Sequence, residues 1–127
     1  MTTRELSILT VDDEASVNHS VRFALGGPGR IFASAAHGED ALEQIQEKEP
    51  PFDLIVIDHK MPPVNGVELV RRLRAISFGG KIIVLSAHLD HEARRTYEEM
   101  NVDVMLSKPF DVRELRDAVE QVVRDVG

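Results

Sequence analysis

The chain has 127 residues, a formal net charge of −7, 43% apolar and 29% charged residues, and no cysteine. This length suits one domain with its own hydrophobic core, and the lack of cysteine excludes disulfide and thiol chemistry and fits a cytoplasmic protein. No apolar run approaches the length of a membrane span, and the acidic charge argues against nucleic-acid binding by this domain, so we expect neither a membrane nor a nucleic acid as partner.

Five short apolar runs, rich in β-branched residues, alternate with stretches in which apolar residues have helical spacing. The runs predict strands near residues 6–11, 31–35, 53–57, 82–86 and 103–106. The stretches between and after them predict five helices, the first three ending at residues 26–29, 50–51 and 79–80. Asn101, which tolerates the left-handed conformation, ends the fourth helix. Asp111, followed three residues later by Glu114, predicts a capping box at the start of the fifth.

This alternation predicts an α/β fold, with a doubly wound, flavodoxin-like sheet of five parallel strands and five helices. Residues 54–57 and 82–85 show no polar alternation, as expected for central strands that are buried on both faces. We expect the strand order 2-1-3-4-5, which the sequence alone does not determine, with its switch point between the first and third strands. We interpret residues 1–127 as a single domain without an effector domain.

Residues able to carry chemistry come at the ends of four predicted strands. Asp12 and Asp13 follow the first strand, Asp58 follows the third, Ser86 ends the fourth, and Lys108 comes after the fifth. Ligands of such sheets bind outside the carboxyl ends of the strands. The sequence therefore predicts one pocket with three carboxylates, a hydroxyl and an ammonium group, which suits a divalent cation and a phosphoryl group.

Mg²⁺ prefers hard oxygen ligands, so Asp13 and Asp58 are candidate direct ligands and Asp12 a candidate partner of a metal-bound water. The cation would relieve the repulsion between the three carboxylates. Asp58 is the candidate nucleophile, because carboxylates form aspartyl-phosphate intermediates. Lys108 and Ser86 are candidate partners of the phosphoryl oxygens.

Each of these residues also has an ordinary explanation. Asp12 or Asp13 can cap the first helix, and Asp58 can begin a turn. Lys108 can be a surface lysine and Ser86 a helix-start residue. The coincidence of all of them at successive strand ends favours a shared site.

Three other patterns carry less weight. The glycine-rich residues 26–29 follow a helix and lack a Lys-Ser/Thr ending, so they predict a helix stop and not a phosphate loop. His88 and His91 have no evident third metal ligand, so we interpret them as solvated. The three arginines within residues 71–74 lie on a helical stretch, and we interpret them as a solvated helix face and not a nucleic-acid patch.

Taken in order, five segments resemble those of a known family. They are Val11-Asp12-Asp13-Glu14, Asp58-His59-Lys60-Met61-Pro62, Asn65-Gly66, Ser86-Ala87 and Lys108-Pro109-Phe110. With this spacing the chain resembles, over essentially its whole length, the receiver domain of two-component response regulators. The resemblance implies a phosphorylation-dependent switch in which Asp58 accepts a phosphoryl group from the phosphohistidine of a sensor histidine kinase or phosphotransfer protein.

The same resemblance implies the roles of the site residues. Mg²⁺ would be surrounded by Asp12, Asp13, Asp58 and the backbone carbonyl of Lys60. Ser86 and Lys108 would contact the phosphoryl group, and a cis peptide would precede Pro109. Such a domain catalyses only its own phosphorylation and dephosphorylation, and then alters its contacts with a downstream protein or domain, whose identity the sequence leaves open.

One departure from the family concerns the switch. In the family a hydroxyl moves toward the phosphoryl group while an aromatic ring on the fifth strand turns inward. Ser86 supplies the hydroxyl, but the ring position is Met105, which is flexible and has no ring. Tyr97 is too far along the chain to take that position directly. We further hypothesise that Lys60 and His88, each two residues beyond a site residue, tune the lifetime of the phosphoryl group.

Competing functions fit the sequence less well. A Mg²⁺-dependent phosphatase acting on external substrates would carry a second acid at position 60, where this chain has Lys60. A flavin-binding electron carrier would need a Ser/Thr/Gly-rich phosphate loop after the first strand and more aromatic residues. A degenerate receiver that only binds proteins is disfavoured by the complete acidic set. We expect the fourth helix, sparse in apolar residues, to be the most mobile element.

Overall fold

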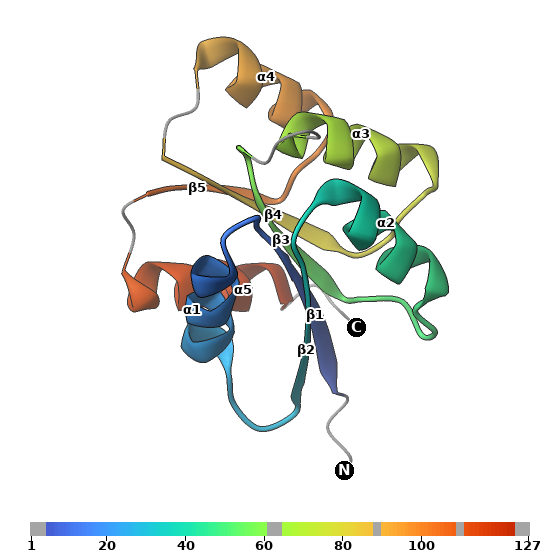
Figure 1. Ribbon diagram of the computed structural model, residues 1–127. Helices are drawn as coiled ribbons and strands as arrows, with labels where there is room; N and C mark the ends of the chain where they lie inside the picture. The colour runs from blue at the N-terminus through green and yellow to red at the C-terminus, as the bar shows by residue number, and fades with distance from the viewer. Residues whose placement is uncertain (1–4, 61–64, 88–89, 109–110, 124–127) are drawn as a thin grey trace.

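The computed structural model describes residues 5–60, 65–87, 90–108 and 111–123. Within them, strands and helices alternate along the chain as β1 (Leu6–Val11), α1 (Ala15–Leu25), β2 (Arg30–Ala35), α2 (Gly38–Glu47), β3 (Leu54–Asp58), α3 (Gly66–Ala75), β4 (Lys81–Ser86), α4 (His91–Glu99), β5 (Val104–Ser107) and α5 (Val112–Val123). All strand pairs are parallel and the sheet has the order β2-β1-β3-β4-β5 (Figure 1). The predicted fold class and strand order are confirmed.

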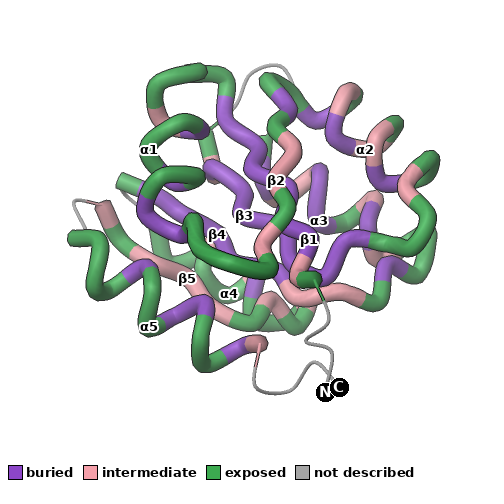
Figure 2. The backbone as a smooth tube through the Cα atoms, turned by 90° about the horizontal axis from the view of Figure 1, so that it is seen from below, coloured by how far each residue is buried: buried purple, intermediate pink, exposed green. Residues whose placement is uncertain are grey.

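The apolar runs become the strands almost residue for residue. Every residue of β3 is buried, and so is every residue of β4 after Lys81. The edge strands β2 and β5 are more exposed, as Figure 2 shows for β2 at the rim of the sheet. The runs without polar alternation are therefore the central strands, as expected for segments that are covered on both faces.

Successive residues of each strand point to opposite faces, and helices cover both faces (Figure 1). Ile8 of β1 belongs to the core that α1 and α5 cover, and Leu9 belongs to the core under α2, α3 and α4. The same alternation separates Val56 from Ile57 in β3. The sheet is thus the middle layer of three, and its carboxyl edge is left for loops.

The end of α1, the end of α4 and the start of α5 agree with the prediction, whereas α2 and α3 end earlier than predicted. Asp111 and Glu114 form the predicted capping box, in which Glu114 N donates to Asp111 Oδ1 at 2.8 Å and Asp111 N donates to Glu114 Oε1 at 3.3 Å. Asn101 has a φ of 60° after α4, as its tolerance of the left-handed conformation predicted. The end of α3 was predicted at residues 79–80, but the helix ends at Ala75, because Ser77 takes a φ of 59° and reverses the chain earlier.

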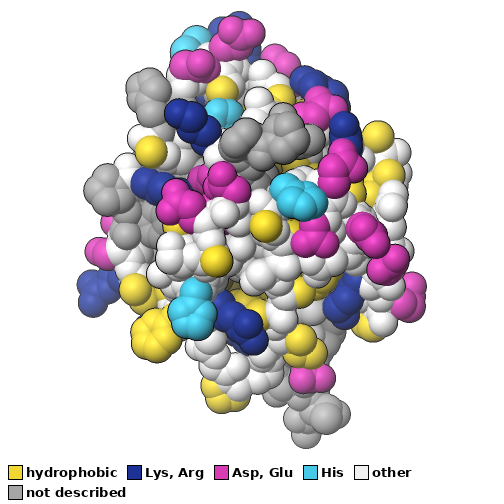
Figure 3. All heavy atoms as spheres, viewed as in Figure 1, with side chains coloured by type: hydrophobic (Ala, Val, Ile, Leu, Met, Phe, Trp, Pro, Cys, Tyr) yellow, Lys and Arg dark blue, Asp and Glu magenta, His cyan; other side chains and the backbone are white. Residues whose placement is uncertain are grey.

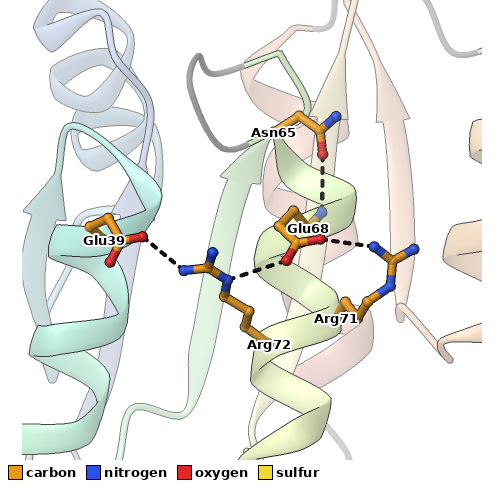
Figure 4. A network of polar contacts seen from close by, with 5 residues as sticks. All are labelled: Glu39, Asn65, Glu68, Arg71 and Arg72. Atoms are coloured by element: carbon orange, nitrogen blue, oxygen red, sulfur yellow. Dashed lines mark hydrogen bonds and ion pairs between the residues drawn. The ribbon is translucent and has the colours of Figure 1, made fainter.

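The arginines of α3 contact neighbouring elements. Arg72 bridges Glu68 of its own helix, at 3.3 Å, and Glu39 of α2, at 2.8 Å, while Arg71 pairs with Glu68 at 2.8 Å (Figure 4). Asn65 caps the same helix, since its side chain accepts a hydrogen bond from Glu68 N at 3.0 Å. Exposed pairs of this kind contribute little to stability, because water and salt screen their charges. The cluster therefore joins α2 to α3, in agreement with the interpretation as a solvated helix face.

The third arginine of this helix has a structural role as well. Arg74 donates to the backbone carbonyls of Met100 and Asn101, at 2.8 and 2.9 Å, and so fastens α3 to the end of α4. On the face seen in Figure 3, acidic and basic side chains are interspersed with scattered apolar ones, so this face carries no large patch of one charge. Among the described residues, no helix is both long enough and apolar enough to span a bilayer.

Candidate functional site

Three carboxylates meet at the carboxyl edge of the sheet. Asp58 is the last residue of β3, while Asp12 and Asp13 directly follow β1. The parallel register pairs Val11 with Ile57, so the two strands end side by side. One carboxylate oxygen from each of the three aspartates lies within 4.8 Å of the others. The predicted convergence of these residues is therefore present in the structure.

Asp12 is the most deeply buried of the three. Its side chain is buried, and its Oδ1 accepts a hydrogen bond from Glu14 N at 2.9 Å. Within the described part of the chain, its Oδ2 is buried without a hydrogen-bond partner, and Lys108 Nζ lies 3.9 Å away, too far for a hydrogen bond. Burial raises the pKa of Asp12 to about 6, with the negative charges of Asp58 and Asp13 adding to the rise, while the Glu14 amide and Lys108 oppose it. A buried carboxylate oxygen without a hydrogen-bond partner among the described residues is suited to bind a cation.

The first helix is not capped by the aspartates themselves. Glu14 occupies the N-cap position of α1, and its side chain makes no capping hydrogen bond. Asp12 accepts from the backbone of Glu14, one residue before the helix, so the pair of aspartates is positioned by the turn between β1 and α1. The ordinary explanation of Asp12 and Asp13 as helix caps is wrong for this structure.

A buried asparagine holds this turn in place. Asn18 Nδ2 donates to the backbone carbonyls of Asp12, at 3.0 Å, and Ala35, at 3.2 Å. The amide thus joins the ends of β1 and β2 to the first turns of α1. The role of Asn18 was not predicted from the sequence. It could have been suspected only from the position of Asn18 beside Val17 on the inward side of the helix, where a buried polar side chain needs a hydrogen-bond partner.

Lys108 lies near two of these carboxylates, those of Asp12 and Asp58. Its Nζ lies 2.9 Å from Asp58 Oδ1, and its backbone N donates to Ser86 O at 2.7 Å. Ser86 ends β4 and is buried, and Asp58 is buried too. The loop after β5 is therefore joined to β3 by a charge-assisted hydrogen bond and to β4 by a backbone one.

The remaining predicted residues are placed less closely. Lys60 is exposed and lies two residues after the end of β3. Met105 is half-buried in β5 and packs against the core under α2, α3 and α4. His88 lies outside the described residues. The Lys108-Pro109 peptide bond, which was predicted to be cis, also falls outside them, because Pro109 is not described.

An aromatic pair next to Asp58 was missed from the sequence. His59 Nδ1 lies 2.6 Å from the hydroxyl of Tyr97, and the two rings pack edge to face with their centroids 5.5 Å apart. Tyr97 comes from α4 and is fully buried. Although it does not occupy the Met105 position, its hydroxyl reaches the residue that follows the candidate nucleophile.

The environment of this pair favours uncharged groups. Burial raises the pKa of the Tyr97 hydroxyl, and the negative charge of Asp58 adds to the rise. Burial lowers the pKa of His59, although the charges of Asp58 and Asp90 oppose it. We therefore assign a neutral imidazole whose Nδ1 shares one hydrogen bond with the Tyr97 hydroxyl, and the tautomer of the ring decides which group donates.

Comparison with known proteins identifies this arrangement. The family model described as "Response regulator receiver domain" matches residues 8–120. The chain belongs to the response-regulator receiver family. Receiver domains of this family interact with histidine kinases or phosphotransfer proteins in two-component signalling. The alternatives of a phosphatase for external substrates and of a flavin carrier are thereby set aside.

Individual relatives agree with this assignment. Sporulation initiation phosphotransferase F of Bacillus subtilis is 29% identical over 114 residues, covering 90% of this chain and 90% of that protein. The transcriptional regulatory protein PrrA of Mycobacterium tuberculosis is 36% identical over 120 residues, but these are 94% of this chain and 51% of PrrA. The structure of the Vibrio cholerae chemotaxis protein CheY4 superposes with a TM-score of 0.84 at 28% identity, covering 93% of this chain and 98% of that one. This receiver domain thus spans most of some relatives and about half the length of others.

Proposed function

We propose that Asp58 of this receiver domain accepts a phosphoryl group from the phosphohistidine of a sensor histidine kinase or a phosphotransfer protein. A carboxylate oxygen of Asp58 attacks phosphorus, the P–N bond of the phosphohistidine breaks, and the bonding electron pair returns to the imidazole. The product is an acyl phosphate on Asp58. The observation that carries the proposal is the grouping of three carboxylates within 4.8 Å, one of which is Asp58 in contact with Lys108 Nζ at 2.9 Å.

The donor set fits a hard divalent cation, and we assign Mg²⁺. Asp12, Asp13 and Asp58 offer carboxylate oxygens, and the Lys60 carbonyl would be a further ligand. The fit rests on the buried Asp12 Oδ2, which lacks a hydrogen-bond partner among the described residues. When bound, the ion supplies positive charge beside the phosphoryl oxygens and relieves the repulsion among the carboxylates.

The protein groups around Asp58 have separate tasks. Lys108, whose Nζ already contacts Asp58 Oδ1, offers a point charge to the transferred group, and the Ser86 hydroxyl offers a hydrogen bond. Backbone hydrogen bonds keep these groups in register, because Lys108 N donates to Ser86 O. The exposed side chain of Lys60, two residues after Asp58, influences how long the phosphoryl group persists, and replacement by alanine tests this role through the dephosphorylation rate.

The phosphorylated domain acts by altering its contacts with a downstream protein or domain. Ser86 and Met105 are the proposed switch positions, one at the end of β4 and the other on β5. Their strands are paired, with Val84 opposite Met105 and Ser86 opposite Ser107. The domain then catalyses only its own phosphorylation and dephosphorylation.

Intact-mass spectrometry after incubation with acetyl phosphate tests this function. The expected result is a gain of one phosphoryl group in the presence of Mg²⁺, no gain with a chelator, and no gain in Asp58→Asn. Asp13→Asn, a change of the same charge in the same pocket, is expected to slow phosphorylation at a given Mg²⁺ concentration without abolishing it. Equal labelling of Asp58→Asn and the unchanged protein would overturn the proposal.

A further inference from the structure

The fourth helix reaches the site through a single buried side chain. Of the residues of α4, only Tyr97 is buried, and its ring lies in the core under α2, α3 and α4. A phenylalanine would fill the same space at this position. A hydroxyl in an apolar core is costly unless it is hydrogen-bonded. The Tyr97 hydroxyl has a partner in His59, although 38 residues separate the two along the chain.

His59 is held from three directions. Its backbone N donates to Leu85 O of β4 at 2.9 Å, and its backbone O accepts from Gly66 N of α3 at 2.8 Å. Its side chain meets the Tyr97 hydroxyl of α4 at 2.6 Å. His59 lies between Asp58 and Lys60, the nucleophile and the residue whose carbonyl is assigned to the metal. Contacts that hold His59 therefore also hold the backbone on which both groups depend.

Close packing leaves the Tyr97 hydroxyl little freedom. A Cβ atom built at Gly66 would overlap the hydroxyl oxygen and would lie only 3.0 Å from the Cα of His59. The first residue of α3, the end of β3 and the ring of α4 thus converge on the same oxygen atom. A shift of any one of these elements has to move or break the contact between Tyr97 and His59.

We propose that Tyr97 is a positioning residue for the chemistry at Asp58, because its hydroxyl holds His59 and with it the segment from Asp58 to Lys60. The inference rests on the proposed phosphorylation of Asp58. It adds a dependence of that reaction on α4, through a residue that lies away from the Met105 position. Since coupling between two sites is reciprocal, metal binding and phosphorylation at Asp58 also change the environment of Tyr97.

The hydroxyl can be removed without removing the ring. Tyr97→Phe keeps the packing and deletes the hydrogen bond to His59. The matched control is Thr96→Val, which deletes the neighbouring hydroxyl on α4, whose hydrogen bond goes to Glu92 O at 2.9 Å on the exposed side. His59→Phe removes the hydrogen-bond partner of Tyr97 and keeps a ring, whereas His59→Asn keeps an amide group near the position of Nδ1.

Phosphorylation by acetyl phosphate is followed by intact mass as a function of Mg²⁺ concentration, at a temperature where circular dichroism shows each variant folded. From the net contribution of one hydrogen bond, Tyr97→Phe is expected to raise the half-saturating Mg²⁺ concentration or lower the maximal rate about five-fold. Thr96→Val is expected to match the unchanged protein. In a His59→Phe background, adding Tyr97→Phe should change the phosphorylation rate little further. His59→Asn should keep most of the phosphorylation rate of the unchanged protein.

The chain offers an intrinsic spectroscopic probe for the reciprocal effect. Tyr97 is the single tyrosine and there is no tryptophan, so tyrosine emission reports on this residue alone. Emission is expected to change when Mg²⁺ and acetyl phosphate are added, and the phosphodonor-dependent part should vanish in Asp58→Asn. A merely structural role for Tyr97 would lower stability without this response.

The outcomes separate the two proposals. If the unchanged protein is phosphorylated on Asp58 and Tyr97→Phe has the same rate and Mg²⁺ dependence, the positioning role is overturned and the proposed function stands. The positioning role is also overturned if Thr96→Val is slowed as much as Tyr97→Phe. If the unchanged protein is not phosphorylated with Mg²⁺ present, the proposed function fails and the inference fails with it.

Discussion

Replacing Asp12 with asparagine should stabilise the metal-free protein. Burial and neighbouring carboxylates raise the pKa of Asp12 from 3.8 to about 6. Each pKa unit corresponds to about 1.4 kcal/mol, so keeping Asp12 ionised at neutral pH costs the folded state up to about 3 kcal/mol. Asparagine removes the charge and keeps an oxygen for the hydrogen bond from Glu14 N. We expect Asp12→Asn to raise the free energy of unfolding by roughly 1–3 kcal/mol, or about 4 °C in Tm for each kcal/mol.

The effect should depend on pH in a defined direction. The folded state binds the Asp12 proton more tightly than the unfolded state, so the stability of the unchanged protein falls as pH rises from 3.8 to about 6. Above that range the cost is constant, and below it both states are protonated and the cost disappears. The advantage of Asp12→Asn is therefore complete near neutral pH and lost in acid.

Urea unfolding in the presence of a chelator, at neutral pH and in mild acid, measures this difference. Asp13→Asn is the matched control, because Asp13 is exposed and the charge change is the same. Both variants should lose most of the stabilisation that Mg²⁺ gives the unchanged protein. If Asp12→Asn is no more stable than Asp13→Asn without metal at neutral pH, the inference that the buried charge of Asp12 destabilises the fold is refuted.

Three further predictions concern the groups around the site. Lys108→Met should destabilise the metal-free protein by roughly 1–3 kcal/mol, because the buried Asp58 carboxylate loses its ammonium partner. Mg²⁺ should reduce this loss, and chemical unfolding with and without the ion measures it. Asn18→Ala by itself should lower the free energy of unfolding by roughly 1–3 kcal/mol, because it removes two buried hydrogen bonds. An unchanged midpoint of urea unfolding would contradict their role. Gly66→Ala should cost about 1–3 kcal/mol through overlap with the Tyr97 hydroxyl, and part of that loss should be recovered in a Tyr97→Phe background, as thermal unfolding of the single and double variants would show.

The sequence predicted the sheet and the acidic site well for a physical reason. Central strands of a parallel sheet need apolar residues on both faces, so runs such as residues 54–57 can be recognised as strands from the sequence alone. Parallel strands also end on one edge, so Asp12 and Asp58 had to lie together once the strand order was right. The Asp111–Glu114 capping box is equally local, because both residues belong to one turn.

The features that the sequence did not predict depend on how distant elements pack. Tyr97 looked like one weak apolar residue on a polar helix, and only the placement of α4 against the end of β3 brings it to His59. Asn18 found its partners in two strand ends, one of them 17 residues away. The early end of α3 arises from the left-handed conformation of Ser77, which could not be predicted because serine seldom adopts that conformation.

Localisation of the phosphoryl group tests the central claim most directly. The protein is incubated with acetyl phosphate and Mg²⁺, and borohydride then reduces any aspartyl phosphate to homoserine, which peptide mass spectrometry locates. The account predicts homoserine at Asp58 and at neither Asp12 nor Asp13, with none formed when Mg²⁺ is chelated. Homoserine at another aspartate, or phosphorylated protein without any homoserine at Asp58, would contradict it.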